Sequence, residues 1–310
     1  MPLVAALDAI RPDQIKRTSA PKSGTPKRTN TTFFRATAEA PNLPSAYITR
    51  YDPAQVARAH YHEVDQFQLI LDGKGKFGRH DVSAYCLHFS RAYTPYGPLV
   101  SDPEFGWAFL GLRARFDPGA QQFPDSKVKL RRIPNRQPWQ IMKRIAFLPM
   151  SSGVIMQPIP GIQDDQGLSA NSLAMGPNTS ALMPNPACGD GQFVVVLRGS
   201  MLHEGKENNA LAVVFSNPDD GAYKLIAGKE GLQALVLNLP LVRDRTDQIK
   251  EASTAQGIHR RQCSLCSFVY DEALGLPADG IAPGTTWENL PDSWTCPDCS
   301  ASKSEFLYLS

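Results

Sequence analysis

The chain has 310 residues, about twice the length of an average domain, so two or three folding units are expected. Its 42% hydrophobic and 20% charged residues are typical of a globular protein with a substantial core. No apolar run approaches the ~18 residues of a membrane helix. The N-terminal stretch also lacks a signal-peptide pattern, so we expect a cytoplasmic protein without a membrane partner.

Residues 1–38 are polar and rich in Lys, Arg, Thr and Ser, which predicts a basic flexible tail. A nucleic-acid-binding arm would have a similar composition. The near absence of helical or strand periodicity favours a solvated tail or a strap on the body instead, and no nucleic-acid partner is expected.

From residue 39 to residue 240, short apolar runs alternate with Gly, Pro and Asp, for example FQLILDG, WAFLGLRARF, FVVVLRG and LQALVLNL. Many short strands separated by turn signals indicate an all-β sandwich or barrel. One segment, RQPWQIMKRIAF (136–147), could form a helix that joins two halves. Residues 241–260 are polar and read as a linker.

An internal repeat supports two halves. Residues 66–73 (QFQLILDG) match residues 192–199 (QFVVVLRG), 126 residues later. A second pair follows at nearly the same offset, GWAFL from Gly106 against GLQALV from Gly231. Repetition at one spacing predicts two similar β-barrels in tandem.

Four of the six cysteines form two Cys-x-x-Cys pairs, Cys263/Cys266 and Cys296/Cys299, with 29 residues between the pairs. In a chain without an export signal this pattern favours metal ligation over disulfides. Two facing pairs complete a tetrahedron of four thiolates, which suits iron or zinc. The two single cysteines, Cys86 and Cys188, are expected to be small buried apolar residues.

The sequence around these cysteines resembles rubredoxin over residues 261–310. It carries the aromatic positions of that family at Tyr270, Trp294 and Phe306, and the segments ADGIAPGT and LPDSW. The resemblance implies one iron held by Cys263, Cys266, Cys296 and Cys299, an electron-carrier role, and a rubredoxin reductase or another electron donor as partner. Structural zinc is the alternative.

One departure from the family is visible. Ser267 and Ser300 follow the second cysteine of each pair, where rubredoxins usually have Gly. Glycine relieves strain at positive φ, so serine is expected to cost a little stability without abolishing metal binding.

The net charge is only +2, but it is unevenly spread. Residues 261–310 hold two basic and seven acidic side chains, a net charge of −5, which leaves +7 on the rest. Opposite charges of this size favour docking of the acidic C-terminal unit on the basic body or on a basic partner.

The segment His60-Tyr61-His62 leads into the strand of the first repeat. Residues two apart on a strand point the same way, so His60, His62, Gln66 and Gln68 share one face. Two imidazoles and an amide oxygen on one face could converge on a metal ion.

This stretch is similar to the first motif of the cupin family, with Gln66 where the family has an acidic ligand. The second cupin motif is approximated by PYGPLV (95–100), with Val100 in the place of a third histidine. The resemblance implies a first cupin-like barrel over residues 39–135 with Fe(II) held by His60, His62 and Gln66. A helix and a degenerate second barrel would occupy residues 136–240.

Other candidates for the site are less defined. His88, in an apolar strand, could be a ligand, an acid or base, or a packed core residue. In the second barrel, Pro186 and Cys188 stand where His60 and His62 would be, so we expect no metal there. The second barrel is expected to have a structural role or a role in dimerisation.

Together these features lead to a working hypothesis, a rubredoxin-fused cupin that acts as a non-haem iron oxygenase. It would oxidise a small, possibly aromatic molecule with O₂, as a monooxygenase fed with electrons by the rubredoxin unit at high effective concentration. The alternative is an electron-transfer or redox-sensing protein whose cupin body is a metal-free binding module. A homodimer is a further expectation, by analogy with cupins.

Overall fold

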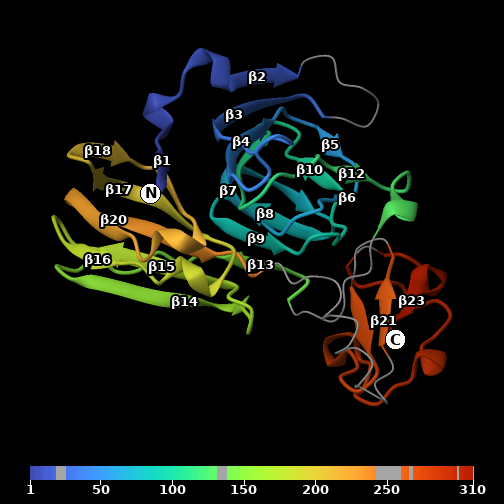
Figure 1. Ribbon diagram of the computed structural model, residues 1–310. Helices are drawn as coiled ribbons and strands as arrows, with labels where there is room; N and C mark the ends of the chain where they lie inside the picture. Colours follow the sequence, from blue (N-terminus) through green and yellow to red (C-terminus); the bar gives the residue numbers. More distant parts are fainter. Residues whose placement is uncertain (19–25, 131–137, 242–259, 265–267, 299, 310) are drawn as a thin grey trace.

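In the computed structural model, residues 1–18, 26–130, 138–241, 260–264, 268–298 and 300–309 are described. The described chain is all-β, with short 3₁₀ turns and no α-helix among those residues. It forms two tandem cupin-like barrels and a small C-terminal domain (Figure 1). No helix in the described ranges is long and apolar enough to span a membrane. The 3₁₀ turns are η1 (Leu7–Ala9), η2 (Pro12–Gln14), η3 (Lys127–Lys129), η4 (Pro186–Cys188), η5 (Pro218–Asp220), η6 (Pro277–Asp279), η7 (Trp287–Asn289) and η8 (Lys303–Glu305).

The first barrel is built around a ten-stranded sheet with the central order β13-β9-β7-β11-β4-β3-β2. Its pairings are antiparallel, so neighbouring strands can be linked by short turns. The strands of this sheet are β2 (Ile15–Thr18), β3 (Arg28–Phe34), β4 (Ser45–Tyr51), β5 (Val56–Ala57), β7 (Gln66–Phe77), β8 (His80–Ser83), β9 (Cys86–Ser90), β10 (Leu99–Ser101), β11 (Trp107–Arg113) and β13 (Gln140–Arg144). Two further strands of the barrel, β6 (His60–Tyr61) and β12 (Gln121–Gln122), pair with each other in a separate two-stranded sheet.

The second barrel is built on an eight-stranded sheet with the central order β1-β19-β17-β20-β15-β14. Its strands are β1 (Leu3–Ala5), β14 (Val154–Gln163), β15 (Ser169–Met175), β16 (Ser180–Leu182), β17 (Gln192–His203), β18 (Lys206–Asn209), β19 (Val213–Ser216) and β20 (Lys224–Asn238). The long strands β17 and β20 are the equivalents of β7 and β11 in the first barrel.

In each barrel, the two segments that the repeat identifies lie side by side as paired strands. Gly73 of β7 pairs with Trp107 of β11, and Gly199 of β17 pairs with Leu232 of β20. Both glycines have a positive φ. A Cβ on Gly73 would lie 2.3 Å from the carbonyl oxygen of Gly106, and a Cβ on Gly199 would lie 2.1 Å from that of Gly231. Glycine is therefore required twice at the same place, as expected for two copies of one structural unit.

Strand alternation separates three apolar regions. One face of β7 and β17 packs between the barrels, where Phe67, Leu69, Phe193 and Val195 belong to one buried cluster. The opposite face of β17 fills the second barrel with apolar side chains such as Val194 and Val196. The interior of the first barrel mixes aromatic residues with buried His60, His62, Gln66, Gln68 and His88. The predicted inward face of His60, His62, Gln66 and Gln68 is therefore the interior of the first barrel.

Two sequence predictions about the chain's course are wrong. The predicted flexible tail contributes strands to both barrels: Leu3–Ala5 pairs with β19, and Arg28–Phe34 pairs with β4. The predicted joining helix falls on residues 136–147, of which 136–137 lie outside the described range, and Gln140–Arg144 form strand β13 along β9. In both cases hydrogen bonding to an open sheet edge decides the conformation.

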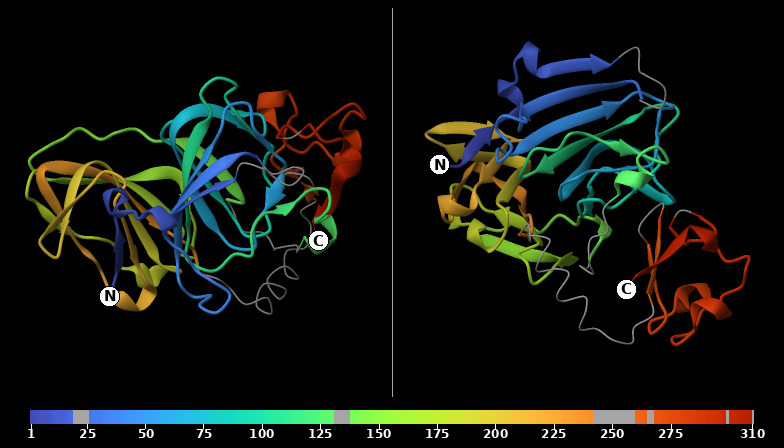
Figure 2. Two further views of the ribbon diagram at one scale, coloured as in Figure 1. Left: turned by 90° about the horizontal axis from the view of Figure 1, so that it is seen from above. Right: turned by 45° about the vertical axis from the view of Figure 1, so that its right-hand side comes forward.

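The C-terminal domain is a three-stranded sheet of β21 (Arg260–Cys263), β22 (Val269–Asp271) and β23 (Phe306–Leu309). Its small core gathers Tyr270, Trp287, Trp294 and Phe306, with ring centroids 4.8 to 5.9 Å apart in five of the six pairs. Most of the predicted linker, residues 242–259, lies outside the described residues. In both views of Figure 2 this domain lies beside the first barrel.

Candidate functional site

The cysteine centre lies at one end of the C-terminal domain. Cys263 and Cys296 are each 1% exposed and pack with Tyr270 and Trp287. The two chain segments fold back as tight turns, since the N–H of Cys263 donates to the carbonyl of Phe268 and that of Cys296 to Ala301. The other two predicted ligands, Cys266 and Cys299, lie outside the described residues. Two buried cysteines in paired turns fit a tetrathiolate metal site.

Ser300 has a left-handed backbone, with φ of 60°. This is the position at which the sequence predicts strain, because rubredoxins usually place Gly there. The N–H of Ser300 donates to the carbonyl of Cys296 over 2.8 Å, which closes the turn that carries the second cysteine pair. The turn thus forms with serine in place of glycine. Ser267, the other such position, lies outside the described residues.

Two ion pairs join this domain to the first barrel. Arg79 meets Asp298 at 3.1 Å, and Lys127 meets Glu305 at 2.9 Å. Asp298 lies within the second cysteine pair, and Glu305 also accepts a hydrogen bond from Ser264, the neighbour of Cys263. The end of the domain that carries the cysteines therefore faces the first barrel. The basic partners belong to the body and the acidic ones to the C-terminal domain, in line with the charge division in the sequence.

A cleft of about 540 Å³ lies between the two parts. Asp298 borders it from the C-terminal domain, and Phe77, His80 and His88 border it from the barrel. Burial raises the pKa of Asp298, and the nearby Arg79 opposes this effect. Some side chains that line the cleft, such as Phe77, also pack in the interior of the first barrel.

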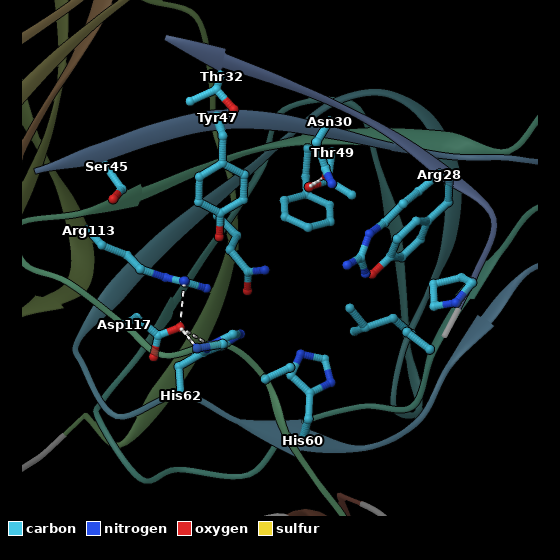
Figure 3. Close-up of a pocket in the computed structure, with 18 of the residues that line it drawn as sticks. Arg28, Asn30, Thr32, Ser45, Tyr47, Thr49, His60, His62, Arg113 and Asp117 are labelled. Atoms are coloured by element: carbon cyan, nitrogen blue, oxygen red, sulfur yellow. Dashed lines mark hydrogen bonds and ion pairs between the residues drawn. The ribbon is translucent and has the colours of Figure 1, made fainter. Parts of the chain in front are cut away.

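A second cavity, called here the barrel pocket, opens inside the first barrel and has a volume of about 210 Å³ (Figure 3). His60 and His62 lie on one wall, with ring centroids 5.3 Å apart. The Nδ1 of His60 lies 2.7 Å from the carbonyl of Arg58, and the Nδ1 of His62 lies 2.7 Å from Asp117. Since both partners accept hydrogen bonds, each Nδ1 carries the proton and each Nε2 keeps a lone pair.

Both imidazoles are neutral at physiological pH. Burial, with a smaller contribution from the charge of Arg113, lowers the pKa of His60 to about 3 and that of His62 to about 4. Neutral imidazole is the form that binds metal ions and accepts hydrogen bonds. The pair can therefore act as two acceptors on one wall of the pocket.

Gln66 has a different role from the predicted metal ligand. Its Oε1 accepts hydrogen bonds from both Nε and Nη2 of Arg113, at 3.0 and 2.8 Å. Its Nε2 donates to Ser90 and to the hydroxyl of Tyr96. With the amide oxygen occupied by a guanidinium, no lone pair is directed at the histidines, so the structure does not bring Gln66 to them as a ligand.

Arg113 and Asp117 form the centre of the polar network. Arg113 reaches Asp117 over 2.8 Å, and both side chains are almost fully buried. Asp117 also accepts from the backbone N–H of Glu63 and of Gly119. Although burial opposes it, these partners hold the pKa of Asp117 at about 2, so the carboxylate is ionised. Charge-assisted hydrogen bonds of this kind fix the position of His62.

His88 lies apart from His60 and His62. It borders the cleft, and its Nδ1 lies 3.0 Å from the Oε1 of Gln68. Tyr96 stands between the two cavities, with ring centroids 4.6 Å from His60 and 5.1 Å from His88. Burial lowers the pKa of His88 to about 3 and raises the pKa of Tyr96. The structure therefore places His88 beyond Tyr96 rather than with the pair.

The donor set of a mononuclear cupin metal site is incomplete here. Val100, in the place of the third histidine, lies on β10 and pairs with Val56 of β5, while its neighbour Leu99 lines the pocket. Within the described ranges, no group of three or more His, Cys, Asp or Glu side chains is placed to hold a metal ion. Two imidazoles remain, which do not fit the predicted set of ligands.

Sequence reasoning missed Arg113 and Asp117. Arg113 stands two residues after Gly111 and four after Phe109 on β11, so strand alternation assigns it to the barrel interior. The signal was available in WAFLGLRARF, where Arg113 continues the inward positions of Trp107 and Phe109. Asp117 follows the strand and carries no periodic signal.

The second barrel shows what the same positions do without this network. Gln192 stands where Gln66 does, and its Nε2 donates to Asn238, its register partner on β20, whereas Gln66 is bound by the guanidinium of Arg113. The surrounding interior is apolar. Of the single cysteines, Cys86 is buried as predicted, whereas Cys188 is exposed and accepts a hydrogen bond from Asn238.

Comparison with known proteins separates the two parts. Residues 260–306 match the family model for rubredoxin. A rubredoxin from Acinetobacter baylyi is 64% identical over 45 residues, which are 14% of this chain and 83% of that protein. For the body, a solved structure from Nostoc punctiforme described as a candidate dioxygenase is 12% identical, with a TM-score of 0.51, and covers 79% of this chain and 85% of its own. A cupin barrel protein from Leptotrichia buccalis is 8% identical, with a TM-score of 0.44, over 72% of this chain and 92% of that one.

Proposed function

Because this chain belongs to the rubredoxin family through residues 260–306, we propose that it is a two-domain oxidoreductase that passes single electrons to its first barrel. The acceptor would be a small molecule bound in the barrel pocket. Cys263, Cys266, Cys296 and Cys299 would hold one iron, which supplies one-electron exchange between its ferric and ferrous states.

The observation that carries the proposal is the docking of the cysteine-bearing end on the first barrel. Arg79 and Lys127 bind Asp298 and Glu305, which flank the two cysteine turns. Of the two barrels, this one has a polar interior and the barrel pocket. A tethered electron carrier benefits from high effective concentration only when its active end faces the acceptor.

Aromatic side chains provide a contiguous contact between the cleft and the pocket. Phe77 and His88 border the cleft, and both pack on Tyr96, with ring centroids 5.7 and 5.1 Å away. Tyr96 packs in turn on His60, which lines the pocket. We therefore propose that electrons cross from the docked domain to the pocket through Phe77 and Tyr96.

An external reductase would supply the electrons. Glu288 and Asp292 of the rubredoxin domain pair with Arg261 and Lys303 of the same domain, but their side chains are 70% or more exposed. We propose that these exposed carboxylates meet a basic donor. A cytoplasmic location is part of the same proposal, because reducing conditions keep the cysteines free of disulfides until iron binds. The homodimer expected by analogy with cupins stays a prediction.

A second candidate is the non-haem iron oxygenase. The adjacent, neutral imidazoles of His60 and His62 favour it, because two such groups are half of a typical ligand set. Donors other than these two side chains would have to complete the site. One atom of O₂ would enter the substrate and the other would leave as water, with two electrons and two protons. The other alternative is an electron-transfer or redox-sensing protein whose barrel is a metal-free binding module, and the guanidinium on Gln66 favours it.

The first test is the iron content of the full chain purified without oxygen. About one iron per chain, lost in Cys263→Ala/Cys296→Ala, supports the electron-carrier centre alone. About two, with one lost in His60→Ala/His62→Ala, supports the oxygenase. No iron bound by the cysteines would contradict the proposal as a whole.

The second test follows reoxidation of the reduced rubredoxin domain through its visible absorbance, with O₂ and candidate small molecules. We expect reoxidation to depend on the small molecule and to fall at least tenfold in His60→Ala/His62→Ala. The matched control is His203→Ala in the second barrel, which should leave the rate unchanged. Equal rates in wild type and the pocket variant would overturn electron delivery to the first barrel.

A further inference from the structure

The barrel pocket carries more positive charge than its own network uses. Arg28, Arg35 and Arg113 line it, and Asp117 is the one acidic side chain among its described lining residues. These arginines and this aspartate give the lining a net charge of +2. Arg113 is already bound to Gln66 and Asp117, so the positive charge available to a ligand comes from the other side of the pocket.

Arg28 provides that charge. It extends from β3 into the pocket from the side opposite Arg113 (Figure 3). Its Nε is buried and has no hydrogen-bond partner among the described residues. Burial of an unpaired N–H is unfavourable, so a ligand that accepts from it would recover that free energy. A carboxylate is the group that an arginine fork binds best, through two parallel hydrogen bonds.

The rest of the lining has a polar part, made by Asn30, Thr32, Ser45, Thr49, Gln68 and Gln122, and an aromatic and apolar part. Tyr47, Tyr51, Leu99 and Phe109 line the same cavity. Burial raises the pKa of Tyr51 to about 12 although Arg28 beside it opposes the shift, so the phenol stays neutral. A volume of 210 Å³ corresponds to about seven water molecules at their share of liquid volume. The pocket therefore has room for a small acid only.

From these observations we propose that the barrel pocket binds a small organic carboxylate with an apolar or aromatic part. Arg28 holds the carboxylate, and Tyr47, Tyr51 and Phe109 contact the apolar part. His60 and His62 present hydrogen-bond acceptors to the opposite end of the ligand. This inference rests on the proposed function only for the choice of the pocket as the place where the electron acceptor binds.

The test is equilibrium binding by titration calorimetry on the full chain with iron in its cysteine site. Benzoate is the probe, and benzamide is the control with nearly the same shape and no charge. We expect benzoate to bind at least tenfold more tightly than benzamide, and the preference to shrink as salt is raised. Equal affinities would overturn recognition through charge.

Two variants locate the carboxylate. Arg28→Gln should lower benzoate affinity at least tenfold, and Arg28→Lys should lose less because it keeps the charge. The matched control is Arg50→Gln, which removes an exposed arginine on the adjacent strand β4 that pairs with Asp72. The circular dichroism spectrum and the visible absorbance of each variant report whether it is folded and holds iron. Unchanged affinity in folded Arg28→Gln would overturn the assignment.

The two proposals can fail separately. Binding is measured at equilibrium with no electron donor present, so absence of electron transfer leaves its result intact. If benzoate binds through Arg28 and the reoxidation rate does not respond to it, the ligand inference stands and the electron route fails. If no carboxylate binds and reoxidation still needs His60 and His62, the electron route stands and the ligand inference fails.

Discussion

Arg113 pairs with Gln66 across β11 and β7, and its guanidinium donates two hydrogen bonds to the amide oxygen of that residue. The same guanidinium binds Asp117, which in turn binds His62. A cation that belongs to the protein thus occupies the position beside the histidines. Through its hydrogen bonds, Arg113 holds Gln66 directly and His62 through Asp117, the side chains that a bound metal would otherwise hold.

We predict that Arg113→Gln lowers the free energy of unfolding by about 3–5 kcal/mol, because the buried Asp117 loses its charged partner. Urea unfolding measures the change. The matched control is Arg115→Gln, whose ion pair with Asp190 is 43% exposed on the arginine side and should cost about 1 kcal/mol or less. Equal losses in the two variants would show that the buried network contributes nothing special.

Stability should fall as the pH drops below the ordinary pKa of histidine. His60, His62 and His88 stay neutral in the folded chain, with pKa values near 3, 4 and 3, whereas the unfolded chain protonates them below about pH 6.5. The unfolded state then binds more protons, so stability is full above that pH and is lost on acidification. Between pH 7.5 and 5.5 the three groups should remove about 4 kcal/mol.

The measurement for this pH effect is urea unfolding at both pH values, compared between wild type and His88→Phe. Removal of one titrating group should reduce the loss by about a third. An identical pH dependence in the variant would be evidence that His88 is not neutral in the folded protein.

Ser300→Gly should stabilise the cysteine centre. The backbone there is left-handed at φ of 60°, which costs an L-residue about 1 kcal/mol and costs glycine nothing. Loss of visible absorbance during denaturation measures the change. Ser302→Gly is the control, because its φ of −68° suits any residue and glycine should destabilise it. If both variants were more stable than wild type, the positive φ at Ser300 would not be the cause of the gain in stability.

Docking of the rubredoxin domain should weaken with salt. The ion pairs Arg79–Asp298 and Lys127–Glu305 are partly exposed, so each contributes about 1 kcal/mol or less and is screened by ions. Energy transfer between dyes on the two parts should drop in Arg79→Glu/Lys127→Glu at low salt and in wild type at high salt. Arg50→Glu, remote from this contact, should leave the transfer unchanged. Insensitivity to both charge reversal and salt would mean that other contacts hold the domain.

The sequence predicts much of this architecture for physical reasons. Alternation in QFQLILDG assigns Gln66 and Gln68 to one face and Phe67 and Leu69 to the other. In the structure the first face is the barrel interior and the second packs between the barrels. The glycines of the repeat are detectable because only glycine fits where the two long strands cross. The two cysteine pairs predict a tetrathiolate metal site, and the resemblance of the surrounding sequence implies the rubredoxin domain.

Other parts are not predictable from local patterns. The strand Gln140–Arg144 has a composition that suits a helix, and only the open edge of β9 makes it a strand. The partnership of Gln66 with Arg113 needs the register of two strands, which no local pattern encodes. Gln66 could be a metal ligand only if its amide oxygen were free. The guanidinium of Arg113, on the neighbouring strand β11, binds that oxygen.

The pairing of Leu3 with Phe215 has a consequence for synthesis on the ribosome. Strand β1 emerges before every strand of the barrel that it completes, and it must wait while the whole first barrel and most of the second are translated. Until β1 binds, the backbone groups of β19 along that edge remain open. Chains released early, or lacking their first residues, would expose this edge and associate through it, so that the N-terminal strand protects nascent copies from one another.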